Sequence, residues 1–430
     1  MRFALLFVAV MIVAALLWSC AGGQTSKYFV VRVVDEQTGR GVPLVELKLP
    51  NKVKYWTDSA GVAALDEPSL CEREVFLGIR SHGYEYPQET LFGRGAIVKI
   101  DPGKMQEGRV RRTMIAERLY RLTGEGIYRD SVMAGLPVPA KEPMLNAQVL
   151  GQDTVSAAIY RGKIFWIWGD TIGPAYWNFS VSAATSDLRD DPAVAVNYSY
   201  FTDTEGRAKQ MLPLPGEGLV WIEGLVPMKD PHGEDRLIAT YTRQDGLQFP
   251  DECGLALFDD VLQVFKPWVQ MPCRKRHISS HPFLHDGYWY LYPSLRVLND
   301  WSAIQDSTQW EKRDVQLPPN AKRPSCVVWN EYRQRWILLL EEVGDVYYAE
   351  ARQPEGPYGK AVKIIHHDQY NFYNVATHTF FNQESGRVIY LEGTYTASFS
   401  GATEKTPRYD YNQVMYRLRL DDPRLRGAQE

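Results

Sequence analysis

Strand-length runs of apolar, β-branched and aromatic residues recur through the last two-thirds of the chain, each entered through a polar turn and ended by polar residues. A shorter run of the same kind precedes each of them across a turn, so every copy reads as strand, turn, strand. Strand repeats with a period of about 40 to 50 residues are typical of the blades of a β-propeller. We therefore predict five blades within 146–420, whose main runs are 163–171, 235–243, 287–294, 335–342 and 387–394.

The first part of the chain has a different pattern. Residues 27–122 contain short strands with alternating apolar and polar positions, separated by glycine turns about every ten residues, which predicts a small β-sandwich. Residues 123–145 contain Pro137, Pro139 and Pro143 and few strand-forming residues, as expected of a connector. The predicted fold is all-β, with a small N-terminal β-sandwich followed by a five-bladed β-propeller.

Residues 1–20 have the pattern of an export signal: Arg2, then an apolar stretch over 3–18, then small residues. The segment Leu17-Trp-Ser-Cys20 also resembles a bacterial lipobox, in which Cys20 would be lipidated. Lipid anchoring at Cys20 and free secretion both remain open. In either case we expect an exported protein that is periplasmic, outer-membrane-anchored or extracellular, and that meets a membrane only through such an anchor.

Composition narrows the classes of partner. The 48 Lys and Arg residues nearly balance the 52 Asp and Glu residues, so the chain lacks the basic excess of a nucleic-acid-binding protein. Aromatic residues make up 12% of the chain. In an all-β protein most of them fill the space between sheets, but Trp and Tyr in an open cleft also suit the C–H faces of sugar rings.

Besides Cys20, the chain has four cysteines, at 71, 253, 273 and 326. An exported protein can form disulfides. Cys253 and Cys273 flank one predicted blade and are the pair to test, whereas a buried free thiol is the alternative for each cysteine. Their spacing does not match a zinc site, and we expect no cofactor, although a single structural cation in the propeller channel remains open.

Ring closure suggests where chemistry could lie. The inner strands of a propeller begin at one mouth of the channel, so side chains far apart in sequence meet there. Asp170 and Glu392 end the next strand of the first and fifth copies, which ring closure makes neighbours, and each adjoins a glycine that allows close approach. The candidates at the starts of the inner strands are Asp153, Glu223, His281, Arg323 and His378. Trp168, which lies close to Asp170 in the sequence, is a further candidate.

A cluster of carboxylates with a few basic groups suits glycoside hydrolysis. One acid protonates the departing oxygen, and another carboxylate activates water or attacks the sugar. Asp153 and Asp170 lie 17 residues apart (170 minus 153) on adjacent predicted strands, so the separation of roughly 6.5 to 9.5 Å used by inverting enzymes is reachable. A structural role is the alternative for each candidate, because Asp at a strand end commonly forms turns.

Two family resemblances add to this interpretation. The run Asp35-x-x-Thr-Gly-x-Gly-Val-Pro43, with 57–61 after it, resembles the carboxypeptidase regulatory-like, transthyretin-like sandwich. That resemblance implies a structural or docking role for 27–122. Gln152-Asp153 followed by Trp168-Gly-Asp170-Thr171 resembles the opening blade of a formerly uncharacterised family of five-bladed propellers linked to endo-D-arabinanase activity.

The second resemblance implies a glycosidase with Asp153 and Asp170 as its catalytic pair. His281-Pro-Phe and the aromatic run 288–292 are more loosely similar to glycoside hydrolase family 43. The chain departs from that family in offering His281 where a third acid would stand, so the sugar and linkage stay open. The sequence predicts an exported glycoside hydrolase that acts on a polysaccharide.

The alternative is a non-catalytic carbohydrate-binding or scaffold propeller, because a fold does not fix a function. The mouth of the propeller would discriminate between them. Carboxylates grouped around an open cleft would favour the enzyme, and a mouth plugged by the connector would favour the binding protein.

Overall fold

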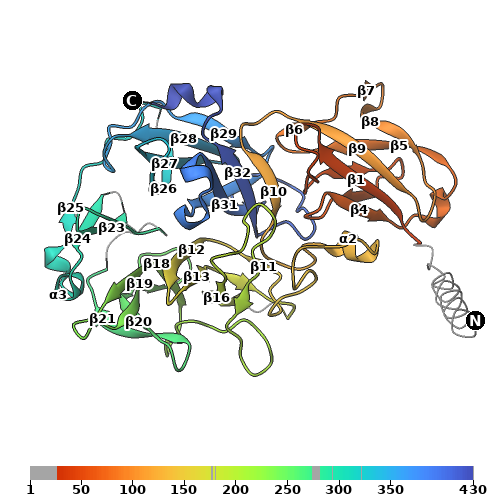
Figure 1. The fold of residues 1–430 in the computed structure, drawn as a ribbon. Coiled ribbons are helices and arrows are strands. Elements are labelled where there is room, and N and C mark those ends of the chain that lie inside the picture. Colours follow the sequence, from red (N-terminus) through yellow and green to blue (C-terminus); the bar gives the residue numbers. More distant parts are fainter. Residues whose placement is uncertain are drawn as a thin grey trace, which may run out of the picture.

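The computed structural model describes residues 27–175, 178–179, 181–273, 281–292, 294–320 and 322–429. The predicted export signal and the lipobox at Cys20 lie outside these residues. The fold is all-β, as predicted, and consists of a sandwich on one side and a ring of sheets on the other (Figure 1). None of the helices in the described ranges is long and apolar enough to cross a membrane.

The sandwich consists of two sheets. Apolar side chains of both sheets meet in one core, and β5 (Glu74–Arg80), for example, alternates between buried and less buried positions. The first sheet has the order β4 (Val62–Leu65), β1 (Phe29–Asp35), β9 (Met105–Arg112) and β6 (Tyr84–Glu85). The second has the order β3 (Lys54–Trp56), β2 (Glu46–Lys48), β5 (Glu74–Arg80), β8 (Gly93–Lys99) and β7 (Glu89–Thr90).

The described part of the propeller contains five four-stranded sheets, and the paired strands in each are antiparallel. Four of these blades follow the chain in order. The first blade consists of β12 (Val155–Tyr160), β13 (Lys163–Trp168), β16 (Ser182–Ser186) and β17 (Ser199–Tyr200), and the second of β18 (Leu219–Lys229), β19 (Asp235–Gln244), β20 (Glu252–Asp259) and β21 (Val264–Gln270). The third blade consists of β22 (Phe283–His285), β23 (Tyr288–Tyr292), β24 (Leu295–Leu298) and β25 (Glu311–Lys312). The fourth consists of β26 (Arg323–Asn330), β27 (Arg335–Glu342), β28 (Asp345–Ala351) and β29 (Val362–His366).

The fifth blade is built from both ends of the propeller. Its order is β30 (Asn371–Thr377), β31 (Val388–Thr396), β32 (Asn412–Arg419) and β10 (Glu117–Arg121). In Figure 1 the orange strand β10 lies beside the blue strand β32. Residues 117–121 were predicted to belong to the sandwich, but this strand covers the otherwise open edge of the last sheet. The propeller therefore begins before the connector.

The remaining elements are short. A small sheet orders β11 (Gly151–Gln152), β14 (Thr171–Ile172) and β15 (Asn178–Phe179) next to the first blade. Short helical segments occur between strands, namely α2 (Arg129–Met133), α3 (Trp301–Gln305), η1 (Pro68–Leu70), η2 (Ser307–Gln309), η3 (Thr379–Phe381) and η4 (Glu384–Gly386), and η5 (Pro423–Ala428) follows the last strand. The predicted disulfide is confirmed, because Cys253 and Cys273 are bonded, whereas Cys71 and Cys326 are free thiols.

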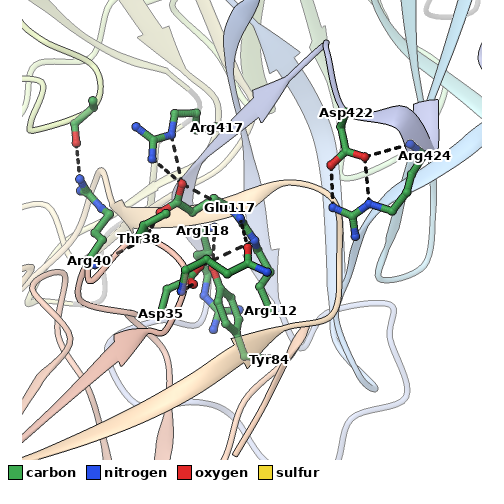
Figure 2. A network of polar contacts seen from close by, with 12 residues as sticks. Asp35, Thr38, Arg40, Tyr84, Arg112, Glu117, Arg118, Arg417, Asp422 and Arg424 are labelled. Carbon is green, nitrogen blue, oxygen red and sulfur yellow. Dashed lines mark hydrogen bonds and ion pairs between the residues drawn. The ribbon is translucent and has the colours of Figure 1, made fainter. Parts of the chain in front are cut away.

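A buried polar network on β10 joins the sandwich to the propeller (Figure 2). Glu117 accepts hydrogen bonds from Thr38 Oγ1 at 2.9 Å and from Arg417 Nη2 at 2.5 Å. Arg118 donates to Pro43 O at 3.1 Å and to the carbonyl of His82 at 3.0 Å. A buried network whose members find partners fixes one arrangement of the parts that it connects.

The sandwich also contacts the loop 397–411, which connects β31 to β32. The buried hydroxyl of Tyr409 donates to Thr57 O at 2.7 Å and accepts from Leu44 N at 3.2 Å. Lys54 forms an ion pair with Glu404 at 2.8 Å. The position of this loop is therefore set by the sandwich as well as by the fifth blade.

Candidate active site

A pocket of about 820 Å³ opens at one end of the ring and is lined by four of the five blades. Its wall contains the starts of the first strands, such as Arg323 on β26, and the ends of the second strands, such as Glu341 on β27. This is the arrangement that the sequence analysis predicted for a shared mouth. Four predicted site residues line it: Asp153, Asp170, Glu223 and Arg323.

Asp153 and Asp170 face each other across the open end of the β12–β13 hairpin. The register pairs Val155 with Trp168, which places the two aspartates opposite one another just beyond the ladder. The amide of Asp153 donates to Asp170 O at 3.3 Å. A Cβ atom on Gly169 would lie 2.3 Å from Asp153 Oδ1, so a larger residue at this position would displace that carboxyl group.

Aromatic donors from neighbouring blades hold the two carboxyl groups. Tyr373 on β30 donates to Asp153 Oδ2 at 2.7 Å. Trp221 Nε1 on β18 donates to Asp170 Oδ1 at 3.0 Å, and the Tyr411 hydroxyl lies 3.4 Å from Asp170 Oδ2. The Tyr411 hydroxyl also interacts with Asp153, so one phenol contacts both carboxyl groups. The pair is thus fixed before any substrate arrives.

Burial raises the pKa of Asp153 to about 6, and the negative charge of Asp170 acts in the same direction. Hydrogen bonds from Tyr373, Tyr411 and Thr154 favour the ionised form and oppose that rise. A carboxyl group with a pKa close to neutrality retains its proton over part of the working pH range. Asp153 is therefore suited to deliver a proton to a departing oxygen.

Glu341 also lines the pocket, although it was not among the predicted site residues. Its carboxylate is buried and lines the pocket, where it pairs with Arg323 and accepts a hydrogen bond from Val375 N at 3.2 Å. A local signal did exist, because Glu341 ends the main run of the fourth blade at the place where Asp170 ends that of the first. Tyr373, Trp221 and Tyr411 were also missed, and their role follows only from the closure of the ring.

The structure places the other four candidates outside the lining of this pocket, although they were predicted to gather at the mouth: Trp168, His281, His378 and Glu392. The inner strand of the fifth blade begins at residue 371, so Asn374 reaches the mouth and His378 lies deeper. Trp168 is buried and packs on Trp166. His281 is also buried, and the centre of its ring lies 5.4 Å from the centre of the His378 ring.

His378 and Glu392 form a buried pair inside the ring, with His378 Nε2 2.7 Å from Glu392 Oε1. Burial raises the pKa of Glu392 to about 8 and lowers the pKa of His378 to about 3. Burial thus favours the uncharged form of both groups. The pair is part of the core. Within the described residues, no three His, Cys, Asp or Glu side chains gather as metal ligands.

A second pocket of about 790 Å³ lies at the turns that end the first strands of blades 1 to 3, which is the opposite end of these sheets. Its acidic residues have structural partners. Asp230 pairs with Arg236 at 2.9 Å, Asp235 pairs with Lys229 at 2.8 Å, and Asp300 caps α3. None of these carboxylates faces another as Asp153 faces Asp170, so the first pocket is the better candidate for catalysis.

Comparisons with known proteins gave structural matches alone. No protein-family model matches the chain, and no curated protein matches it by sequence. Similar solved structures include a GH43_1 enzyme from Xanthomonas citri complexed with xylose, with 13% identity, a TM-score of 0.41, and coverage of 64% of this chain and 88% of that one. An endo-1,5-alpha-L-arabinanase from Thermotoga petrophila has 12% identity, a TM-score of 0.38, and coverage of 62% and 71%.

Bacillus subtilis levansucrase is a third similar structure, with 11% identity, a TM-score of 0.38, and coverage of 66% of this chain and 86% of that one. All three identities are low and all three TM-scores lie below 0.5. The assignment of a function therefore depends on the residues of the pocket itself.

Proposed function

We propose that the protein is a glycoside hydrolase that cleaves a neutral polysaccharide with Asp153 and Asp170. The observation that carries this proposal is the facing pair of carboxyl groups in an open pocket, held by aromatic hydrogen-bond donors. The connector 123–145 is absent from the lining of this pocket. The feature that would have favoured a purely binding propeller is therefore missing from the described mouth.

The two carboxyl groups have different roles in this proposal. Asp153, whose pKa burial raises to about 6, donates its proton to the glycosidic oxygen as the bond to the sugar breaks. Asp170 is the ionised carboxylate, which either activates a water molecule as a base or attacks the sugar as the nucleophile. Tyr411 contacts both groups and keeps their spacing constant.

The charge of the pocket points to a neutral substrate. Its acidic lining residues are Asp153, Asp170, Glu223, Glu341 and Glu342, whereas its basic lining residue is Arg323, which is paired with Glu341. An excess of one sign in a concave site repels ligands of the same sign. Polysaccharides that carry carboxylate or sulfate groups should therefore be poor ligands.

A panel of polysaccharides tests the proposed function. Wild-type protein is incubated with neutral polymers, namely arabinan, xylan, mannan and mixed-linkage glucan, and with polyanions, namely polygalacturonate and alginate. We expect oligosaccharides to be released from at least one neutral polymer and from neither polyanion. The Asp153→Asn/Asp170→Asn double variant is the matched control. Release from the polyanions alone would contradict the neutral pocket, and the same release by the control would contradict the role of the aspartates.

Removal of the Tyr373 hydroxyl should shift the pH profile. The Tyr373 hydrogen bond stabilises ionised Asp153, so Tyr373→Phe raises the pKa of Asp153 further. If Asp153 is active in its protonated form, the wild type loses activity as the pH rises through about 6. In the variant this loss should occur at a pH that is roughly 1 unit higher. The measurement is kcat/KM against pH for both proteins. A shift of the alkaline limb to lower pH would contradict Asp153 as the acid.

A further inference from the structure

The loop 397–411 presents an aromatic side chain to solvent in the wall of the pocket. Phe399 lines the pocket and is 77% exposed, although phenylalanine is usually buried. Its backbone has φ +59°, in the left-handed region that bulky residues rarely adopt. Burial does not account for this position, so a ligand that covers the ring is the explanation to consider.

Hydrogen bonds fix the backbone on both sides of Phe399. Ala397 N donates to Asp410 Oδ1 at 2.6 Å, and Ser400 Oγ donates to Ala397 O at 2.6 Å. Asn371 Nδ2 donates to Ser398 O at 3.4 Å. Farther along the loop, the sandwich holds Glu404 and Tyr409 through the contacts described above. The ring is therefore carried by a braced loop and needs little ordering when a ligand binds.

Other parts of the pocket wall are apolar as well. Leu247 on the second blade lines the pocket and is 78% exposed, and Val343 on the fourth blade lines it and is 56% exposed. The carboxylates of the first and fourth blades lie among these apolar side chains. A sugar ring offers the matching pair of surfaces, with C–H groups for the apolar walls and hydroxyl groups for the carboxylates.

The order of the blades relates these walls to the reacting pair. Asp153 and Asp170 belong to the first blade, and its inner strand β12 contacts β18 of the second blade and β30 of the fifth. Phe399 belongs to the fifth blade and Leu247 to the second. The reacting pair therefore lies on the blade between the two apolar walls, and a chain that crosses the pocket would place sugar rings on both sides of the bond to be cleaved.

We propose that Phe399 is a stacking platform for a sugar ring of a neutral polysaccharide, one subsite away from the bond that Asp153 and Asp170 cleave. The pocket then binds the interior of a chain and not merely its terminal sugar. This inference rests on the proposed function, because it takes its substrate class and its reacting pair from that proposal.

The test compares three variants. Phe399→Ala removes the platform, Phe399→Trp keeps an aromatic face, and Phe92→Ala is the matched control, because Phe92 is 80% exposed but lies on the sandwich. Binding is measured by gel electrophoresis in the presence of each of the four neutral polysaccharides of the panel. For binding, each variant and the reference carry Asp153→Asn/Asp170→Asn, so that the polymer is not degraded. Melting temperatures show whether each variant is folded.

We expect Phe399→Ala to weaken retention of the protein by the polysaccharide and to raise KM for the cleaved polymer by about tenfold. This is the effect of losing the apolar contact between a sugar and part of one aromatic ring. Hydrolysis of a 4-nitrophenyl monoglycoside of the same sugar, which does not reach the platform, should change by less than about twofold. Phe399→Trp should retain wild-type affinity, and Phe92→Ala should have no effect.

The outcomes separate this inference from the proposed function. If the wild type cleaves a polymer and Phe399→Ala binds and cleaves it equally well, the platform is wrong and the hydrolase stands. If Phe399→Ala loses affinity but the wild type releases no sugar, the platform stands and the hydrolase is wrong. If none of the neutral polymers is retained or cleaved, both are overturned.

Discussion

Replacement of either catalytic aspartate by asparagine should lower kcat on the cleaved polysaccharide by at least about a thousandfold, which is the upper part of the range for loss of a general acid or base. An asparagine at position 153 could not donate a proton to the departing oxygen, and one at position 170 could not act as base or nucleophile. Because the two groups act together, the Asp153→Asn/Asp170→Asn double variant should be little worse than either single variant. The measurement is the initial rate of release of reducing ends.

Folding should survive these substitutions. Burial and the charge of Asp170 both disfavour the ionised form of Asp153 and raise its pKa. Removing the negative charge of either aspartate should therefore leave the melting temperature equal or slightly higher. Asp187→Asn is the control, because Asp187 is a half-exposed carboxylate paired with Arg189 and lies outside the pocket. Unchanged activity in a single variant would remove that aspartate from the mechanism.

Loss of the charge on Glu117 should be the most damaging change outside the pocket. Glu117→Gln leaves Arg417 without the carboxylate that lies 2.5 Å away, and it removes one of the two carboxylates beside Arg112, which keeps Asp35 at 3.7 Å. Both arginine side chains are largely shielded from water. Uncompensated charge in a buried network costs about 3 kcal/mol of unfolding free energy. Urea unfolding followed by tryptophan fluorescence measures this loss.

An exposed ion pair provides the comparison for this prediction. Asp187→Asn removes a pair whose arginine is 89% exposed, and it should change the unfolding free energy by less than about 0.5 kcal/mol. If Glu117→Gln costs no more than Asp187→Asn, then the network shown in Figure 2 contributes nothing measurable to stability.

The blades could be predicted from the sequence because their signal is local. Alternating or continuous apolar runs with polar turns mark each strand, whichever sheet it joins. The position of β10 could not be predicted in this way. Its pairing with β32 joins residues that are 300 positions apart, such as Glu117 and Arg417, and no pattern within the strand shows which edge it covers.

The site was predicted in part for the same reason. Asp153 and Asp170 end two adjacent strands, so their proximity follows from one hairpin. Glu392 was misplaced because β31 is buried along its whole length, so a polar residue at its centre lies in the core and not at the mouth. Tyr411 lies in a loop, and its backbone has φ +64°. No periodic pattern in the sequence predicts the direction of the side chain of such a residue.

The composition of the fifth sheet affects how the protein can be synthesised. Because β10 precedes all the other propeller strands in the chain and its partner β32 is the last of them, β10 leaves the ribosome with an unpaired edge and remains so until the final strand is translated. The first four blades can form before β32 is present, but the ring closes only after that strand has been added. A chain that ends before residue 412 would retain this open edge and would be prone to pair with other chains.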